Sequence, residues 1–318
     1  MASVEYSIII PIFKNEGSVQ DIFKRLEEIK VSLKNDIEVI FVNDFSPDKS
    51  FEKIYENLEK VDFKVKILNH SKNLGSFAAM RTGLIEAEGK FFSIMTADLQ
   101  EPRELIVSFF KSLKDDESDV VIGQRENRKD ADPIISRFFS NTFWWIYNKT
   151  IFKDVPSGGF DVFGCNSKFR DQLVSINETR SSLIGQILWL GFRRKFIKYS
   201  RLERKDNKKS GWTFIKKIDY ALDSFFSFSN LPVTLIIVIG FFSFLFLLCL
   251  FFFLIFLEKT TINEIDYLSV FFIILAANII NILSTGIIGI YVWRTYENSK
   301  RRPVSIVATR YKNKKYEK

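Results

Sequence analysis

An acid and an amide, Asp98 and Gln100, follow the apolar run Phe91–Ile94 within the segment TADLQEP. Alternate side chains of an extended segment share a face, so we expect Thr96, Asp98 and Gln100 to point to the same side. Mg²⁺ or Mn²⁺ takes one or two protein oxygens and fills its remaining positions with water and phosphate oxygens. Asp98 and Gln100 could supply that pair. The alternative is a solvated surface turn, in which Asp and Pro are common.

Polar side chains also follow two earlier apolar runs. Asn15 and Glu16 lie in PIFKNEG, and Asp44 and Asp48 lie in VNDFSPD. Each pair could simply cap a helix or stabilise a turn. A nucleotide, however, needs acceptors for its ribose and base beside a metal for its diphosphate. The combination with Asp98 therefore favours a nucleotide site.

Composition limits the chemistry further. His70 is the single histidine, and Cys165 and Cys249 cannot form a disulfide framework because Cys249 lies in a long apolar segment. Zinc sites built from His and Cys are therefore excluded, and a metal must be held by oxygen ligands. The chain has neither G-x-G-x-x-G after its first apolar run nor G-x-x-x-x-G-K-[ST], which argues against a dehydrogenase or a P-loop NTPase.

The elements that must position these residues alternate in type over the first ~200 residues, as in an open α/β sheet. The predicted strands are YSIIIP, IEVIFV, VKIL, FFSIM and DVVIG. The predicted helices are Val19–Leu33, Ser50–Leu58, Ser76–Ala87, Arg103–Leu113, Pro133–Asn148 and Ser181–Leu190. Continuous apolar strands between helices predict a parallel sheet buried on both faces. Ligands of such sheets bind beyond the carboxyl ends of the strands, where the polar segments lie.

Two uncharged apolar segments, about 233–257 and 267–293, follow this domain. Each exceeds the ~20 residues that a helix needs to cross a bilayer. Basic segments, Arg193–Lys217 and Arg294–Lys318, flank the pair, whereas the connecting loop EKTTINEID is acidic. The positive-inside rule then places both flanks, and with them the α/β domain and both termini, in the cytoplasm.

The net charge of +8 is accounted for by these flanks, so membrane placement explains it better than nucleic acid does. Thr213–Asn230 carries apolar residues on one helical face and is expected to lie in the membrane interface. An ordinary packed surface helix is the alternative. Small residues in NILSTGIIG favour close helix packing and make a homo-oligomer possible.

Six motifs in order resemble glycosyltransferase family 2: IIIPIFKNE, FVNDFSPDKS, NLGSFAAMRTGL, TADLQEP, GQR and GGFD. Within it the chain resembles the polyprenyl-phosphate glycosyltransferases, the group of dolichol-phosphate mannose synthase and the bacterial undecaprenyl-phosphate glucosyltransferases. The resemblance extends through the two apolar segments to GIYVWRTYENSKRRPVSIV. It implies a GT-A domain over 1–210, an interfacial amphipathic helix over 211–230, two transmembrane helices within 231–293 and a basic cytoplasmic tail over 294–318.

The resemblance also implies residue roles. Pro11, Phe13 and Glu16 would line the pocket for the nucleotide base, and Asp44 would lie near the base or the ribose. Asp98 and Gln100 would hold Mg²⁺ or Mn²⁺. The acceptor phosphate would contact Arg125, Arg137 and Ser140, and catalysis would rest on Asp98, Arg125 and Arg137. Arginine suits phosphate through its bidentate fork, although a surface ion pair is the alternative for either arginine.

The expected activity is inverting, metal-dependent transfer of a single hexose-type sugar from a nucleotide to undecaprenyl or another polyprenyl phosphate at the cytoplasmic face of a bacterial inner membrane. UDP-glucose is the favoured donor, ahead of UDP-GlcNAc, UDP-linked amino-arabinose and GDP-mannose. A lipid monophosphate has a second pKa near ~6 and is already an anionic nucleophile, so no strong base is required. Positioning and electrostatics would supply most of the catalysis.

Two other functions compete with this one. A processive polysaccharide synthase would need more apolar spans and usually a Q-x-x-R-W motif, whereas QILWLGFRR lacks the Arg-Trp pair. A non-catalytic membrane scaffold or sugar-nucleotide sensor is suggested by Thr96, since many relatives carry Asp at this position. Retention of Asp98, Gln100, Arg125 and Arg137 argues against the non-catalytic alternative.

Overall fold

The computed structural model describes residues 4–126, 134–153, 155, 159–178, 181–202, 214–258 and 267–316; the side chains of residues 134–140, 214–218 and parts of the apolar helices are outside this description. Its strands are β1 Tyr6–Ile12, β2 Ile37–Asn43, β3 Lys64–His70, β4 Phe91–Ile94, β5 Val120–Glu126, β6 Phe163–Asn166, β7 Arg194–Ser200 and β8 Val307–Lys312. Its helices are α1 Val19–Leu33, α2 Ser50–Asn57, α3 Ser76–Glu86, α4 Arg103–Lys114, α5 Ile134–Thr150, α6 Ser167–Ser175, α7 Leu183–Trp189, α8 Phe214–Phe228, α9 Leu231–Glu258 and α10 Tyr267–Ser299, before a short 3-10 turn at Lys314–Tyr316.

The strands form one mixed sheet in the order β7-β5-β6-β4-β1-β2-β3-β8. β1 pairs in parallel with β2 and β4, β2 with β3, and β5 with β7, whereas β6 and β8 run antiparallel to their neighbours. Every residue of β2 is buried, because the sheet carries apolar cores on both faces. The predicted α/β class with a mostly parallel sheet is confirmed.

Three strands and one helix are absent from the sequence-based prediction. β6 has only four residues, and α6 follows it directly. β7 and β8 carry Lys and Arg along largely exposed faces. Both strands lie at the edges of the sheet, where charged side chains are normal. The same charges make these segments look like basic membrane flanks.

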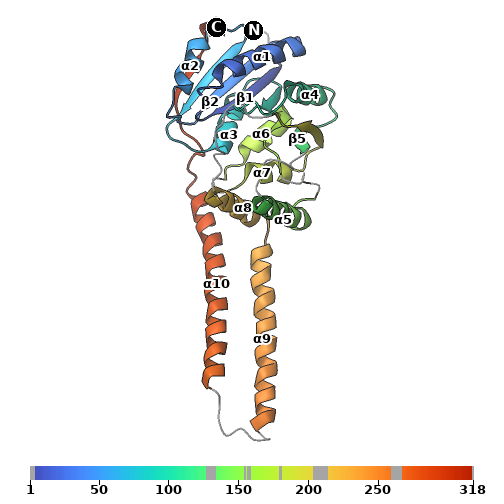
Figure 1. Ribbon diagram of the computed structural model, residues 1–318, viewed down its shortest axis with the longest axis vertical. Helices are drawn as coiled ribbons and strands as arrows, with labels where there is room; N and C mark the ends of the chain where they lie inside the picture. The colour runs from blue at the N-terminus through green and yellow to red at the C-terminus, as the bar shows by residue number, and fades with distance from the viewer. Residues whose placement is uncertain are drawn as a thin grey trace.

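The segment that the sequence presents as a basic tail therefore closes one edge of the sheet. β8 runs antiparallel to β3, and buried Asn313 continues the contact. Its amide donates to Phe63 O over 2.9 Å and accepts from the Val65 N–H over 3.1 Å. The ring of Tyr311 lies 5.4 Å from that of Phe51. Figure 1 shows the chain leaving α10 and running past the sheet to the opposite end of the molecule.

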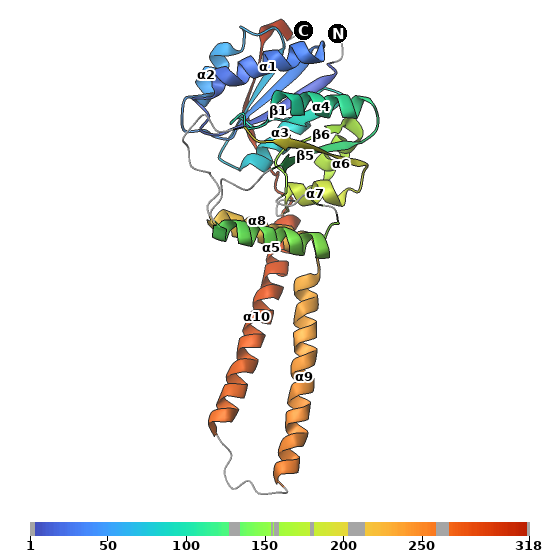
Figure 2. The same cartoon turned by 45° about the vertical axis from the view of Figure 1, so that its right-hand side comes forward.

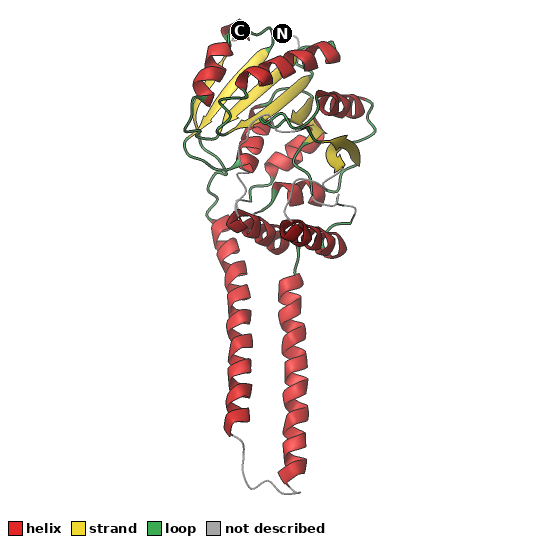
Figure 3. Cartoon of the chain, in the orientation of Figure 1, coloured by secondary structure: helices red, strands yellow, loops and turns green. Residues whose placement is uncertain are grey.

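Two helices in the described chain are long and apolar enough to cross a membrane, over Leu231–Leu250 and Ile273–Ser299. They extend away from the sheet as a pair, and neither apolar window is buried (Figure 3). α5 and α8 lie side by side across the sheet-proximal ends of this pair (Figures 1 and 2). The Phe225 ring of α8 lies 5.4 Å from that of Phe143 on α5. α8 is thus a helix as predicted, and α5 joins it in one layer.

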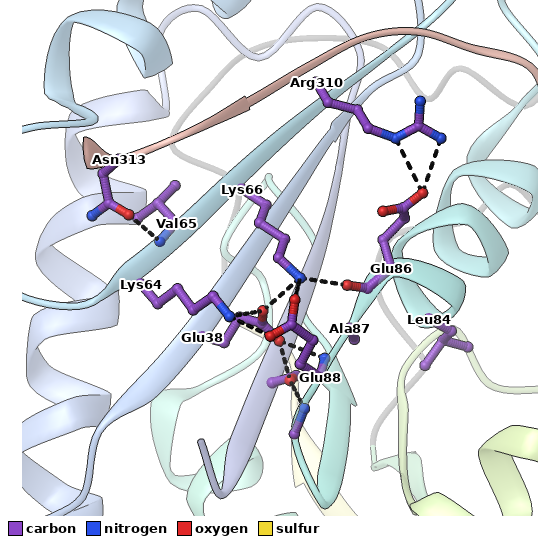
Figure 4. Close-up of polar contacts among 12 residues, drawn as sticks. Glu38, Lys64, Val65, Lys66, Leu84, Glu86, Ala87, Glu88, Arg310 and Asn313 are labelled. Atoms are coloured by element: carbon purple, nitrogen blue, oxygen red, sulfur yellow. Dashed lines mark hydrogen bonds and ion pairs between the residues drawn. The ribbon is translucent and has the colours of Figure 1, made fainter. Parts of the chain in front are cut away.

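An ion network that is buried at Glu38 and Lys66 and exposed at Glu88 occupies the amino ends of the parallel strands (Figure 4). Glu38 is completely buried, and its carboxylate lies 2.9 Å from Lys66 Nζ and 3.3 Å from Lys64 Nζ. The Ser7 hydroxyl donates to Glu38 over 2.7 Å, and Glu88 lies 2.5 Å from both lysines. Because ligands of such sheets bind at the opposite edge, we assign this network a structural role, in which removal of one member would leave a buried charge unpaired.

Candidate active site

The acidic segment after β4 forms a turn. Ala97 and Asp98 are turn residues, and Leu99 adopts a positive φ of 55°. The prediction of an extended segment with strictly alternating side chains was therefore wrong. The turn nevertheless brings Thr96 Oγ1 to 2.6 Å from Asp98 Oδ1, and the same hydroxyl contacts Glu101. Three oxygen-bearing side chains thus converge in one turn.

Gln100 lies on the inner side of this turn and is 7% exposed. Its carbonyl accepts from the Leu202 N–H over 2.8 Å, and its side-chain amide faces Leu202 O at 3.5 Å. These contacts tie the turn to the segment that follows β7. The role of Gln100 as a metal ligand stays a prediction.

Glu101 is a site residue that sequence reasoning missed, although it lies in the same motif. Its side chain is 2% exposed, and among the described residues its Oε1 has no hydrogen-bond partner. Burial raises the pKa of Glu101, and the nearby charge of Asp98 raises it further against the hydrogen bond from Thr96. A signal was available: a carboxylate three positions after Asp98 remains near it when the chain turns.

Two arginines lie at the edge that carries the acidic turn, one on β5 and one directly after β7. Arg201 Nη2 lies 3.7 Å from Asp98 Oδ2. Arg125 pairs with Asp161 of the GGFD motif, and its Nε donates to the Tyr199 hydroxyl over 3.3 Å. Parallel pairing of β5 with β7 sets Arg125 opposite Tyr199, which brings both arginines to the same edge. Sequence reasoning missed Arg201 because it stands in a basic block attributed to the membrane.

Arg137 and Ser140, the other predicted phosphate contacts, lie on α5. Their side chains are outside the described part of the structure. The helix itself lies in the layer next to the apolar pair (Figure 2).

Asp44 is buried after β2, and both of its carboxylate oxygens accept hydrogen bonds. The backbone N–H groups of Leu74 and Gly75 donate to it over 2.8 and 2.7 Å. His70 Nδ1 lies 2.8 Å from Asp44 Oδ1. The carboxylate therefore holds the loop after β3 against the end of β2. Its predicted closeness to a base or ribose is untested.

Asp48 organises the neighbouring loop. It accepts from the hydroxyls of Ser46 and Ser50 over 2.6 and 2.5 Å and from the Glu16 N–H over 3.1 Å. Burial alone would raise the pKa of Asp48, but these hydrogen bonds outweigh it and lower the pKa. Glu16 in turn pairs with Lys53 over 3.1 Å. The loops after β1 and β2 are thereby joined.

Two shallow hollows adjoin these loops at the carboxyl edge of the sheet. One is lined by Lys14, Glu16, Gly17, Pro47, Asp48 and Lys53. The other is lined by Asn43, Phe45, Ser46, Asp48, Phe51, Glu52, Asn69, His70, Ser71 and Ala308. Among the predicted base-pocket residues, Glu16 lines the first hollow, Phe13 is 41% exposed and Pro11 is half-buried. The edge thus presents open surface beside the acidic groups.

The side chains near Asp98 can be compared with the ligands that a divalent cation prefers. No cluster of three His, Cys, Asp or Glu side chains suited to a metal occurs among the described residues. Asp98 is 22% exposed at its side chain, and the unpartnered Glu101 oxygen lies in the same turn. This oxygen set fits Mg²⁺ or Mn²⁺ that takes one or two protein ligands and completes its shell with water and phosphate. It does not fit a site built entirely from protein side chains.

A largely parallel sheet with acidic and basic groups gathered beyond its strand ends is the architecture of a Rossmann-like α/β enzyme. The family model described as "Glycosyl transferase family 2" matches residues 7–175, and the chain belongs to that family.

Related proteins match nearly the whole chain. CsbB of Bacillus subtilis (strain 168), which is named as a glycosyltransferase, is 31% identical over 300 residues, covering 93% of this chain and 89% of that protein. The bactoprenol glucosyl transferase of Shigella phage SfV is 26% identical over 313 residues, covering 96% and 98%. Among solved structures, the mannosyltransferase PcManGT from Pyrobaculum calidifontis in complex with GDP-Man and Mn2+ is 16% identical, with coverage of 64% and 58% and a TM-score of 0.46.

Proposed function

We propose that this glycosyltransferase moves one sugar, with inversion, from a nucleotide sugar to a polyprenyl phosphate at the cytoplasmic face of the membrane. The observation that carries the proposal is the acidic turn at Asp98, which faces Arg201, with Arg125 beside Arg201 at the carboxyl edge of the sheet. Relatives named bactoprenol glucosyl transferase, similar along 96% of this chain, support the lipid acceptor. UDP-glucose, or a related UDP-sugar, is the donor that we propose.

The reaction needs little acid–base chemistry. An oxygen of the acceptor phosphate forms a bond to the anomeric carbon while the bond from that carbon to the nucleoside diphosphate breaks. The phosphate is already anionic near neutral pH. The protein must therefore align two anionic groups and balance the charge that develops on the leaving diphosphate.

Each part of the site has a place in this scheme. Mg²⁺ or Mn²⁺, held by Asp98 together with Gln100 or with the unpartnered Glu101 oxygen, would supply neutralising charge to the diphosphate. Arg125, Arg137 and Ser140 would take the acceptor phosphate. Pro11, Phe13 and Glu16 would form the base pocket, with Asp44 near the base or the ribose. We add Arg201 to the phosphate-binding set, because it faces Asp98 across the site.

The position of the site suits a lipid acceptor. Phe77, at the start of α3 on the carboxyl edge, has its ring 5.9 Å from that of Tyr220 on α8. The carboxyl edge thus lies next to the α5–α8 layer, beyond which the apolar helices extend (Figure 2). A phosphate attached to a membrane lipid rises only a short way above the headgroups. A donor site beside the layer is within its reach if the layer rests on the membrane.

The test is a donor screen with the full-length protein in detergent. UDP-glucose, UDP-GlcNAc, UDP-linked amino-arabinose and GDP-mannose are each incubated with undecaprenyl phosphate and Mg²⁺ or Mn²⁺, and the lipid product is identified by mass. We expect one donor to yield lipid phosphate plus a single sugar, and none to do so with Asp98→Asn. Absence of lipid product with every donor, in a sample that binds nucleotide, would count against the proposal.

A further inference from the structure

The chain after the last apolar helix returns to the nucleotide-side loops within a few residues. α10 ends at Ser299, and Ile306 O already accepts from the Ser71 N–H over 3.0 Å. β8 then pairs with β3 as far as Lys66 and Lys312. This post-helix segment, residues 300–312, thus leads from the end of α10 to the edge of the sheet where the candidate site lies.

One line of polar contacts runs from this segment to Asp44. Ser305 Oγ lies 2.6 Å from Thr82 Oγ1, which lies 2.9 Å from His70 Nε2. The other ring nitrogen of His70 contacts Asp44, whose carboxylate binds the backbone N–H groups of Leu74–Gly75. Ser305, Thr82, His70 and Asp44 thereby connect the post-helix segment to the loop that opens α3.

A second line runs in parallel to Asp48. The Asn69 amide donates to Thr309 Oγ1 over 2.8 Å, and the Asn43 amide donates to Asn69 Oδ1 over 3.0 Å. Asn43 Oδ1 accepts from the Ser46 N–H over 3.2 Å, and the Ser46 hydroxyl donates to Asp48. These four contacts cross β8, β3 and β2 at their adjoining ends. Both carboxylates of the loop after β2 are therefore linked to a hydroxyl of the post-helix segment.

The segment also contributes directly to one hollow of the site. Ala308 of β8 lines it together with Asn43 and Asn69, which belong to the second line. The other end of the segment is fixed as well, because Arg294 near the end of α10 lies 2.6 Å from Asp223 on α8. The Tyr291 hydroxyl of α10 donates to Ser229 O over 2.9 Å. The segment is thus anchored at both ends.

We propose that Ser305 and Thr309 are positioning residues of the nucleotide site, which hold the loop after β2 in the shape that binds the nucleoside of a nucleoside diphosphate. This inference rests on the proposed function and extends it by making the chain beyond the membrane helices part of the donor site. The two hydroxyls act through Asp44 and Asp48 and need not touch the nucleotide.

The test compares Ser305→Ala, Thr309→Val and the double variant in the full-length protein, with Arg310→Gln as the matched control. Arg310 lies in the same strand and makes an exposed ion pair with Glu86 over 3.0 Å, so its loss weakens β8 without breaking either line. Binding of UDP and GDP with Mg²⁺ is measured by calorimetry. We expect the Kd of the preferred nucleotide to rise about threefold in each single variant and about tenfold in the double variant.

A role in positioning also predicts that the KM values for the two substrates respond differently. The KM for sugar nucleotide should rise in the double variant while the KM for polyprenyl phosphate and the thermal midpoint match those of Arg310→Gln. Ser305→Thr and Thr309→Ser, which keep the hydroxyls, should bind the nucleotide with the affinity of wild type. Unchanged affinity in the double variant, or an equal loss in Arg310→Gln, would overturn the inference alone. Wild-type protein that binds no nucleoside diphosphate would overturn the proposed function and this inference together.

Discussion

Arg201 lies 3.7 Å from Asp98, although the two side chains follow strands that are three places apart in the sheet. Burial lowers the pKa of Arg201, and the positive charge of Arg125 lowers it further. Two partly desolvated guanidinium groups therefore share one edge with the acidic turn. An incoming phosphate or diphosphate would relieve their repulsion, which makes Arg201 the residue whose removal tests the electrostatics of the site.

Arg201→Ala should lower turnover about 100-fold at saturating donor and acceptor, because one or two charge-assisted bonds of about 1.5–3 kcal/mol each are lost. Arg201→Lys should retain part of the rate, since it keeps the charge but not the planar fork. The measurement is the initial rate of lipid glycosylation. Arg302→Ala, which removes an exposed charge near the end of α10, serves as the control. A rate within twofold of wild type for Arg201→Ala would remove this residue from the site.

Thr96→Asp should lower the thermal midpoint of the metal-free protein, because a new carboxylate would meet Asp98 and buried Glu101. Mn²⁺ should then raise the midpoint by more than it does in wild type, since the added charge strengthens a site for a hard cation. Thr96→Asn, which has the same size without the charge, separates charge from shape. Equal responses to Mn²⁺ in all three proteins would argue against a metal in this turn.

Glu88→Gln should reduce stability in a pH-dependent way. Burial on its own raises the pKa of Glu88, but hydrogen bonds from Lys64 and Lys66 outweigh it and lower the pKa to about 2. A carboxyl group whose pKa is lower in the folded state stabilises the fold at pH values above its pKa in the unfolded state. That stabilisation is lost as the pH falls through its pKa in the folded state.

The difference in unfolding free energy between wild type and Glu88→Gln should be about 1 kcal/mol near neutral pH, after allowing for the exposed half of the side chain. It should shrink steadily below about pH 4.5. Chemical denaturation at a series of pH values measures it, with exposed Glu27→Gln as the control. A difference that is constant with pH would show that the two lysines do not hold this carboxylate in its charged form.

A chain that ends at Asn230 should be less stable than one in which residues 301–318 are rejoined to it through a flexible linker. The shorter chain lacks β8 and Asn313, which leaves the edge of β3 unpaired and strips the aromatic contact from Phe51. Thermal midpoint and light scattering of the two proteins make the comparison. Equal midpoints would mean that the post-helix segment is not part of the folded domain.

The sequence predicted the centre of the sheet well because buried parallel strands are continuous apolar runs. β2, which is buried throughout, and α1, whose predicted and observed bounds agree, are examples. β7 and β8 were beyond reach, since an exposed edge strand resembles a charged linker until its partner is known. The pairing of β7 with β5 and of β8 with β3 joins residues far apart in the chain, so no local sequence pattern predicts it.

The residues of the candidate site also differ in how far they could be predicted from the sequence. Asp98 follows a strand that the sequence reveals, so its place at the carboxyl edge could be predicted, whereas Arg125 was assigned through the family resemblance. Arg201 could not be predicted, because its position depends on the parallel pairing of β5 with β7. Glu101 was passed over because the segment was treated as extended, whereas the positive φ of Leu99 makes it a turn.

In the proposed reaction a lipid phosphate receives one sugar from the nucleotide sugar. Its most direct test measures nucleoside diphosphate release and glycosyl lipid formation together, with the preferred donor, with and without undecaprenyl phosphate. We expect release to depend on the lipid phosphate, with one lipid carrying a single sugar formed for each nucleoside diphosphate released. Release that proceeds equally without lipid phosphate, or products that carry a growing sugar chain, would contradict it.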